Sequence, residues 1–263
     1  MTSMDLTAIM LIVCAASGMV LLLDLCVLKP RRAAIAAGAG AGPATELSVV
    51  SLARNLFPVL LIVLVFRSFL FEPFRIPSAS MMPGLVDGDF ILVNKFNYGL
   101  RLPLLHTKIL STWSPQRGDV IVFRSTSGPP INLIKRLVGL PGDHIVVRDN
   151  HVSINGAMVP VAPDGEYTGG YGFSGAALAK ETFGSTEHLI MLAQNRYAAD
   201  FDGVVPPGHY FFMGDNRNDS EDSRFEQVGF VPDDHLVGHA IRIWMNWKIP
   251  GWPRLGRIGT PIR

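Results

Sequence analysis

The sequence predicts a mainly β fold: an antiparallel β-sheet domain with a smaller inserted lobe, anchored by two N-terminal transmembrane helices. Two observations predict this arrangement. Two long apolar runs lie within the first 72 residues, and 48 % of all residues are hydrophobic, with a mean hydropathy of +0.29. After residue 72 the chain breaks into short β-rich runs that are bounded by Gly, Pro, Asp and Asn, which is typical of antiparallel sheets.

The first apolar run, Leu6 to Leu28, is long enough to cross a bilayer. A cleavable leader would need basic residues before its apolar core, but the first ten residues contain Asp5 and no lysine or arginine. Basic residues follow the run instead. We therefore expect residues 1–28 to form a retained transmembrane helix, residues 29–48 a cytoplasmic loop, and the N-terminus to lie outside the cytoplasm.

The second apolar run predicts another transmembrane helix over residues 49–72. Arg54 lies near its start and Arg67 near its end, where a long basic side chain reaches the interface. The Ala- and Gly-rich residues 33–45 between the two runs are expected to be a flexible linker. Two crossings place residues 73–263 on the same side of the membrane as the N-terminus.

The predicted β domain, residues 73–263, contains two turn signals and one unusual segment. Asp149-Asn150 and Asn155-Gly156 are the residue pairs that two-residue hairpin turns favour. Residues 164–184 are rich in glycine, and we expect them to belong to an inserted lobe over about residues 155–205.

Charge and cysteine content exclude several functions. The net charge is +1, so nothing indicates a nucleic-acid partner. Both cysteines, Cys14 and Cys26, lie in or at the edge of the first apolar run, so the β domain has no cysteine nucleophile, disulfide or cysteine-based zinc site. His235 and His239 have metal-compatible spacing but no accompanying glutamate. The sequence implies no metal or organic cofactor.

The sequence has no G-x-S-x-G motif, so it does not predict a Ser-His-Asp site of the hydrolase type. A serine with a lysine remains as the candidate pair for nucleophilic catalysis. Lys135 lies in the strand-like run INLIKRLVGLPGD, where alternation places Leu133 and Leu137 on its own face. Burial between apolar groups lowers the pKa of a lysine and makes it a general base. The alternative is an edge-strand lysine that reaches solvent.

Two serines alternate in FRIPSASMMPGL, directly after the second apolar run. In an extended chain Ser78 and Ser80 point the same way, so one can attack while the other stabilises the oxyanion. The alternative is a Ser/Pro turn where the chain leaves the membrane.

These motifs together resemble bacterial signal peptidase I, the Ser-Lys leader peptidase family of the Gram-negative inner membrane. P-S-x-S-M, K-R-x-x-G-x-P-G-D and G-D-N-R-x-x-S-x-D-S-R occur in this order after two apolar runs. The resemblance implies that Ser80 is the nucleophile, Lys135 the general base and Ser78 an oxyanion-hole residue. It further implies that Ser220 hydrogen-bonds and orients Lys135, with Asp222 and Arg224 as a supporting ion pair.

The resemblance also implies a membrane-bound serine endopeptidase that removes N-terminal signal peptides from secretory preproteins after small residues. The catalytic domain and the N-terminus are then periplasmic, and the partners are preproteins, the bilayer and, in a functional encounter, the secretion translocon. An extended substrate would add a strand beside residues 132–135. The implied substrate pocket is formed by Phe74, Ile76, Pro77, Leu85, Ile91, Val122, Asn132, Leu133 and Ile134.

Two other functions stay open from the sequence. One is a specialised Ser-Lys processing peptidase for conjugation or pilus-type proteins, and the other is a membrane-anchored β domain that binds peptides without cutting them. The linker also resembles the small-residue sites that this family cuts. We therefore hypothesise self-cleavage within residues 33–44.

Overall fold

The computed structural model describes residues 3–39, 47–98, 100–101, 108–110, 113–129, 131–193, 199–248 and 250–263. The main division of the chain into two compact units lies between Leu70 and Phe71. This division is two residues before the predicted end of the second span.

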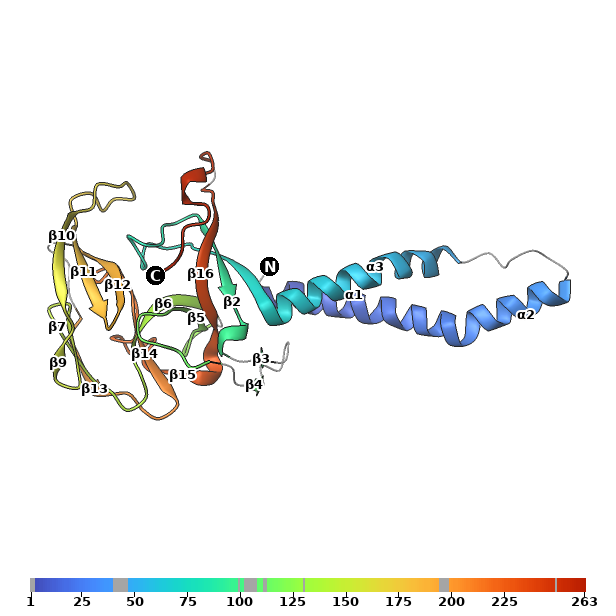
Figure 1. The fold of residues 1–263 in the computed structure, drawn as a ribbon, viewed down its shortest axis with the longest axis horizontal. Helices are drawn as coiled ribbons and strands as arrows, with labels where there is room; N and C mark the ends of the chain where they lie inside the picture. The colour runs from blue at the N-terminus through green and yellow to red at the C-terminus, as the bar shows by residue number, and fades with distance from the viewer. Residues whose placement is uncertain are drawn as a thin grey trace. The chain divides into compact units, whose positions relative to one another are not determined.

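The first unit is helical (Figure 1). It contains α1 (Ser3–Leu23), the π-helical turn η1 (Asp24–Leu28), α2 (Lys29–Ala39), α3 (Ser48–Val65) and the π-helical turn η2 (Phe66–Leu70). By length and composition, Ala8–Ile35 and Ser48–Val65 are each able to cross a membrane. The first helix continues to Ala39, well into the predicted linker, because alanine has the highest helix propensity. The rest of that linker, residues 40–46, lies outside the described residues.

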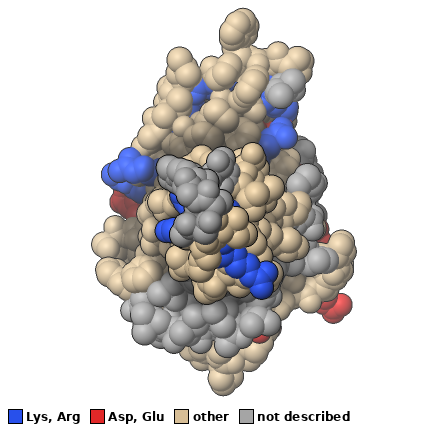
Figure 2. Space-filling view, turned by 90° about the vertical axis from the view of Figure 1, so that its right-hand side faces the viewer, with Lys and Arg blue, Asp and Glu red and all other residues tan. Residues whose placement is uncertain are grey.

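Helices α1 and α3 lie side by side (Figure 1). Gly18 makes this approach possible, since a Cβ atom there would lie 3.0 Å from the ring of Phe57. Outward-facing apolar residues stay exposed, as Ile12 and Ile62 do at 65 % and 68 %, which suits a lipid environment. Figure 2 shows uncharged atoms over most of the visible surface, with lysines and arginines in small separate clusters.

The second unit is built on a seven-stranded antiparallel sheet with the order β1-β2-β16-β5-β6-β14-β15. Its strands are β1 (Phe71–Arg75), β2 (Asp89–Asn94), β5 (Val120–Arg124), β6 (Asn132–Gly139), β14 (His209–Met213), β15 (Val231–Pro232) and β16 (Leu236–Asn246). Short elements accompany it: η3 (Phe96–Tyr98), β3 (Leu100–Arg101), β4 (Lys108–Leu110), η4 (Asp233–His235) and η5 (Leu255–Arg257).

The central strand β5 contributes to two separate apolar clusters. Val120 and Val122 belong to one cluster, while Ile121 and Phe123 belong to another. This division follows from the alternation of side chains along a strand, and it explains why β5 is apolar at every central position. Strand β6 pairs with β5 and is itself buried from Ile134 to Gly139, so it runs through the interior of the domain.

Two smaller sheets lie between β6 and β14 in the sequence and form the inserted lobe. They have the orders β13-β7-β8-β9 and β10-β11-β12. Their strands are β7 (His144–Arg148), β8 (His151–Ile154), β9 (Ala157–Met158), β10 (Val161–Glu166), β11 (Ala177–Phe183), β12 (Thr186–Leu192) and β13 (Phe201–Val204).

Both predicted hairpin turns are confirmed. Asp149 and Asn150 connect β7 to β8 with φ of 48° and 64°, and Asn155 and Gly156 connect β8 to β9 with φ of 53° and 81°. Positive φ at both central residues is the type I′ geometry that these residue types favour. Strand β7 pairs with β13, a long-range contact that no local pattern reveals.

Candidate active site

Ser80 and Lys135 meet in the interior of the second unit, although 55 positions separate them in the sequence. Lys135 Nζ donates a hydrogen bond of 2.6 Å to Ser80 Oγ. Both residues are buried, with exposed fractions of 7 % and 4 %. Strand β6 places Lys135 opposite Ile121 of β5, so the lysine cannot reach solvent as an edge-strand residue would.

The environment of Lys135 favours the neutral amine. Burial lowers the pKa of Lys135 from 10.5 to about 8, and the nearby carboxylates of Asp222 and Asp215 partly oppose this effect. A lysine with such a pKa is neutral in a useful fraction of molecules near neutral pH. It can then accept a proton from the hydroxyl group to which it is hydrogen-bonded.

Ser78 lies beside Ser80, with 3.4 Å between their Oγ atoms. The segment is not extended, as the alternation argument assumed. It bends at Ser78 and turns from Ser80 onward, where Met82 N donates to Ala79 O at 3.0 Å. The turn still brings the two hydroxyl groups to one place, and Ser78 is exposed where a substrate could approach.

The segment after β14, residues 214–224, which we call the catalytic loop, contacts the Ser80 turn directly. Asn216 N donates to Ser80 O at 3.1 Å, and Asn216 Nδ2 donates to Ala79 O at 3.2 Å. At Gly214 a Cβ atom would lie 2.1 Å from Ser220 Oγ and 2.6 Å from Ser80 O. Only glycine allows this close approach of the loop to the turn.

The supporting ion pair has the expected geometry. Arg224 Nε and Nη2 donate to the two carboxylate oxygens of Asp222, each at 2.8 Å, and Asp222 Oδ2 also accepts from Gly214 N at 2.9 Å. The expected hydrogen bond from Lys135 to Ser220 is not formed. Ser220 Oγ is buried and has no hydrogen-bond partner among the described residues, because its hydroxyl lies against the Gly214 backbone while Lys135 donates to Ser80.

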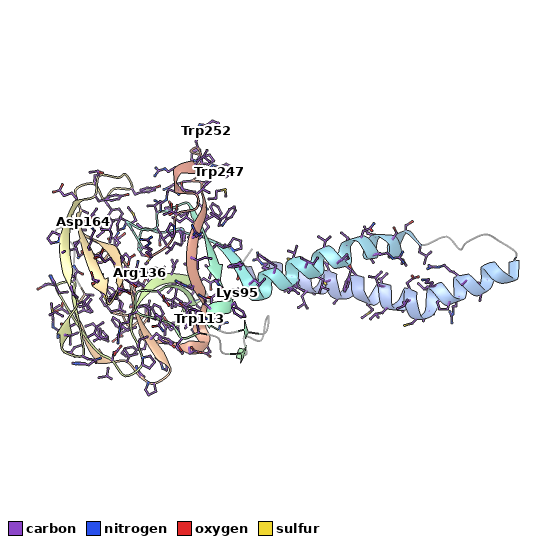
Figure 3. The ribbon with its side chains drawn as sticks, in the orientation of Figure 1. Lys95, Trp113, Arg136, Asp164, Trp247 and Trp252 are labelled. Atoms are coloured by element: carbon purple, nitrogen blue, oxygen red, sulfur yellow. The ribbon has the colours of Figure 1, made fainter. Side chains whose placement is uncertain are left out.

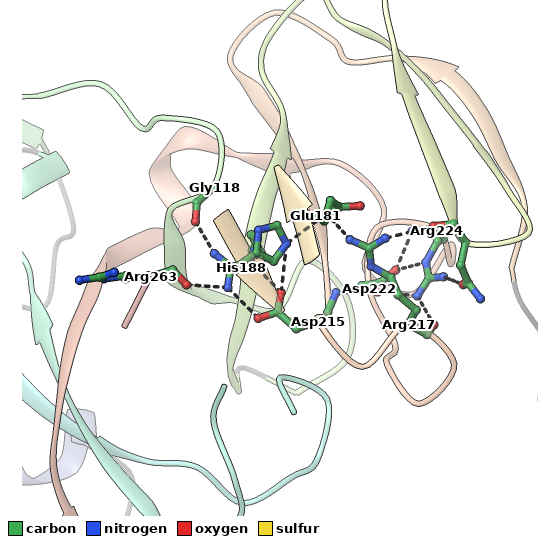
Figure 4. Close-up of polar contacts among 11 residues, drawn as sticks. Gly118, Glu181, His188, Asp215, Arg217, Asp222, Arg224 and Arg263 are labelled. Carbon is green, nitrogen blue, oxygen red and sulfur yellow. Dashed lines mark hydrogen bonds and ion pairs between the residues drawn. The ribbon is translucent and has the colours of Figure 1, made fainter. Parts of the chain in front are cut away.

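A network of buried charges connects β6, the inserted lobe and the catalytic loop (Figure 4). Arg136 donates to both carboxylate oxygens of Asp215 at 2.7 Å, and Figure 3 shows Arg136 inside the domain. On the insertion side, Glu181 pairs with Arg217 and lies 3.1 Å from Nε2 of His188. Burial alone would raise the pKa of Glu181, but Arg217 and His188 lower it to about 2.

The sequence interpretation missed Glu181 and His188. A signal for Glu181 was present in β11, where it alternates with Ala179 and Phe183 and so faces the same buried side. A charged residue at such a position indicates a buried partner. The partner, Arg217, lies on a loop far along the chain and could not be assigned from this pattern.

The residues expected to form the substrate pocket are only partly brought together. Five of them share one buried cluster, and Phe74 packs against it. These five are Ile76, Leu85, Ile91, Val122 and Ile134. Leu133 contacts the other cluster, and Pro77 and Asn132 are exposed. Most of the set is therefore buried core.

The strand that carries Lys135 has a partly unpaired edge. On one side, β6 pairs with β5 from Asn132 to Arg136. On the other side, its register with β14 begins only at Arg136 and continues to Gly139. Within the part of the chain that the structure describes, no strand pairs with the β14 side of residues 132–135. An extended peptide could pair with this edge beside the Ser80–Lys135 contact.

No group of three or more His, Cys, Asp and Glu side chains among the described residues is arranged to hold a metal ion. The chemistry that the site offers is that of a hydroxyl nucleophile with an amine base.

Comparison with known proteins is consistent with this chemistry. The family model for signal peptidase, peptidase S26, matches residues 49–245. Signal peptidase I of Pseudomonas aeruginosa is 44 % identical over 283 aligned residues, covering 98 % of this chain and 99 % of that protein. Signal peptidase I of Pseudomonas fluorescens is also 44 % identical with the same coverage, and that of Rickettsia typhi is 36 % identical over 74 % of this chain. The chain belongs to the signal peptidase I family of membrane-bound serine endopeptidases, peptidase S26.

Proposed function

We propose that this protein removes N-terminal signal peptides from secreted preproteins, with Ser80 as nucleophile and Lys135 as general base. The observation that carries the proposal is the 2.6 Å contact between Ser80 Oγ and a buried lysine whose pKa is lowered to about 8. The 44 % identical relatives are named signal peptidase I, so neither a conjugation-type peptidase nor a non-catalytic peptide-binding domain is favoured.

The reaction begins with neutral Lys135, which accepts the Ser80 proton as Ser80 Oγ attacks the carbonyl carbon of the scissile bond. The developing oxyanion is stabilised by the Ser78 hydroxyl, 3.4 Å from Ser80 Oγ, together with the Ser80 backbone N–H. The Lys135 ammonium then donates its proton to the leaving amine. An acyl-enzyme forms, and water attacks it with Lys135 again as the base.

The catalytic loop supports this chemistry from behind. Asp222 and Arg224 neutralise each other and fix the Gly214 backbone beside Ser80. Ser220 is a proposed orienting residue, because its buried hydroxyl group has no other partner among the described residues. It can accept a hydrogen bond from the Lys135 ammonium in the tetrahedral intermediate, before that proton passes to the leaving amine.

The substrate binds as an added strand along residues 132–135, so that its scissile carbonyl reaches Ser80. A buried apolar cluster that includes Ile76 and Ile134 backs this edge, and we expect the substrate subsites beside it to accept small side chains before the cut and to exclude larger ones. The two apolar helices hold the catalytic domain at the inner membrane. The N-terminus and this domain are periplasmic, where preproteins emerge from the translocon.

Cleavage of a purified secretory preprotein in detergent tests this proposal. Wild type should cut after a small residue, whereas Ser80→Ala and Lys135→Ala should be inactive. Lys180→Ala is the matched control, since Lys180 is half exposed and its ion-pair partner is Asp164 rather than Ser80. A preprotein that binds wild type but stays uncut would refute the function, and an active Lys135→Ala would refute the assigned base.

A further inference from the structure

The proposed function gives no role to the Gly-rich loop, residues 167–176, which connects β10 to β11 in the inserted lobe. Despite its composition, this loop has a defined backbone. Tyr167 N donates to Ala176 O at 2.8 Å, and Gly175 N donates to Tyr167 O at 2.9 Å. Ser174 Oγ also donates to Gly169 O at 2.6 Å. Hydrogen bonds therefore connect the two ends of the loop and also cross its middle.

The Gly-rich loop contacts the turn that carries the nucleophile. Ala79 and Met82 flank Ser80 in sequence, and they belong with Val86 to an apolar cluster that the inserted lobe completes. Three partly buried aromatic side chains of the loop enter this cluster: Tyr167, Tyr171 and Phe173. Met82 is fully buried and Val86 is 4 % exposed. The buried side of the Ser80 turn is thus covered by the Gly-rich loop.

Tyr171 is held in a strained backbone conformation by several contacts. Its φ is +69°, a left-handed value that costs energy for a bulky side chain. The cations of Lys248 and Arg254 lie 5.4 Å and 5.2 Å from the centre of its ring. Lys248 in turn pairs with Asp87, at the end of the turn segment, at 2.6 Å. Such strain persists only where the surroundings fix the conformation, and it marks Tyr171 as the anchor of the loop.

We propose that the Gly-rich loop is a positioning element for the nucleophile, with Tyr171 as its anchor. Through Met82 and Val86 the loop holds the turn at which Ser80 meets Lys135. The aromatic side chains of the loop pack on the Ser80 turn and on Lys248 and Arg254, so we expect the loop to affect the chemical step more than substrate binding. This inference rests on the proposed peptidase function.

Kinetics of preprotein cleavage by Tyr171 variants test the proposal. Tyr171→Ala removes the ring, and we expect kcat to fall at least about tenfold, since small displacements of a nucleophile are costly. KM should stay within about twofold, and the acidic limb of the pH profile should not move. Tyr171→Phe keeps the ring between the two cations and should retain at least about half of the wild-type kcat.

A pair of glycine variants provides a second test that removes no side chain. A Cβ atom at Gly170 or Gly172 would meet nothing within 4 Å. Only Gly172 has a left-handed φ, of +79°, so Gly172→Ala should distort the loop and lower kcat several-fold. Gly170→Ala is the matched control and should behave as wild type. Thermal unfolding in detergent shows which variants are folded, and if Tyr171→Ala is unfolded, the glycine pair decides.

Three results would overturn the proposal. They are a folded Tyr171→Ala with wild-type kcat, a loss confined to KM, and equal kinetics for Gly170→Ala and Gly172→Ala. Wild type and Ser80→Ala are assayed alongside. If wild type does not cleave the preprotein, the proposed function itself fails; if wild type cleaves and the loop variants match it, only the positioning role fails.

Discussion

The pH dependence of cleavage follows directly from the burial of Lys135. The lysine acts as a base only in its neutral form. With a pKa of about 8, roughly 10 % of molecules carry the neutral amine at pH 7, whereas a lysine at 10.5 would be neutral in only about 0.03 %. Burial therefore raises the active fraction at pH 7 about 300-fold, which corresponds to roughly 3 kcal/mol.

The assay is kcat/KM for a preprotein between pH 5.5 and pH 10 in detergent. We expect the rate constant to rise about tenfold per pH unit on the acidic side and to level off above about pH 8. The acidic limb reports the free enzyme's base. A midpoint at or above pH 10 would mean that burial does not perturb Lys135. If Lys135→Ala keeps residual activity with the same acidic limb of the pH profile, that limb reports the ionisation of a group other than Lys135.

Glu221 offers a mild way to move this limb. Its exposed carboxylate raises the pKa of Lys135, so Glu221→Gln should shift the acidic limb to lower pH by a few tenths of a pH unit at low salt. The shift should fade at high ionic strength because exposed charges are screened. Glu226→Gln is the matched control, exposed on the same loop region but not among the groups that influence Lys135 most. A shift to higher pH, or equal shifts in both variants, would contradict the electrostatic reasoning.

Three further predictions use stability and mass spectrometry. Lys135→Met should be inactive, but at pH 7 in detergent its free energy of unfolding should exceed that of wild type by roughly 1–3 kcal/mol, because it removes a buried charge. Its thermal unfolding should therefore occur at a higher temperature. Because folding lowers the Lys135 pKa, wild-type stability should rise between pH 8 and 10.5, and the advantage of Met should shrink there. Asp222→Ala leaves Arg224 buried without its main partner and should lower the free energy of unfolding by about 3–5 kcal/mol; an unchanged thermal unfolding would contradict this. Purified wild type, but not Ser80→Ala, should show cleavage within residues 33–44 by intact mass; identical masses would reject self-cleavage.

The sequence predicted the parts of the fold that depend on local patterns. The two apolar helices, the antiparallel sheet and both type I′ turns follow from composition, alternation and turn residues. The strand face of Lys135 was also predictable, because Leu133 and Leu137 do pack in one cluster. Pairing Lys135 with Ser80 needed the family resemblance, since nothing local connects residues so far apart.

Long-range contacts account for the features that were not predicted. Strand β7 pairs with β13, more than fifty residues later in the chain, and no local pattern predicts this pairing. The prediction that Ser78–Ser80 is extended was wrong. It did not take account of the catalytic loop, whose Asn216 donates hydrogen bonds to the backbone of the turn. The Ser220 contact was expected from a motif that fixes the position of a residue but not the direction of its side chain.

The charges of the catalytic loop raise a physical problem that the structure resolves. The carboxylates of Asp222 and Asp215 both favour a protonated Lys135, which opposes its use as a base. Each carboxylate accepts two hydrogen bonds from an arginine, Arg224 for Asp222 and Arg136 for Asp215, and the charge of Arg224 itself lowers the pKa of Lys135. Burial can then remain the dominant effect on the base. Because buried ion pairs contribute little net stability, their value here is to fix the loop without charging Lys135.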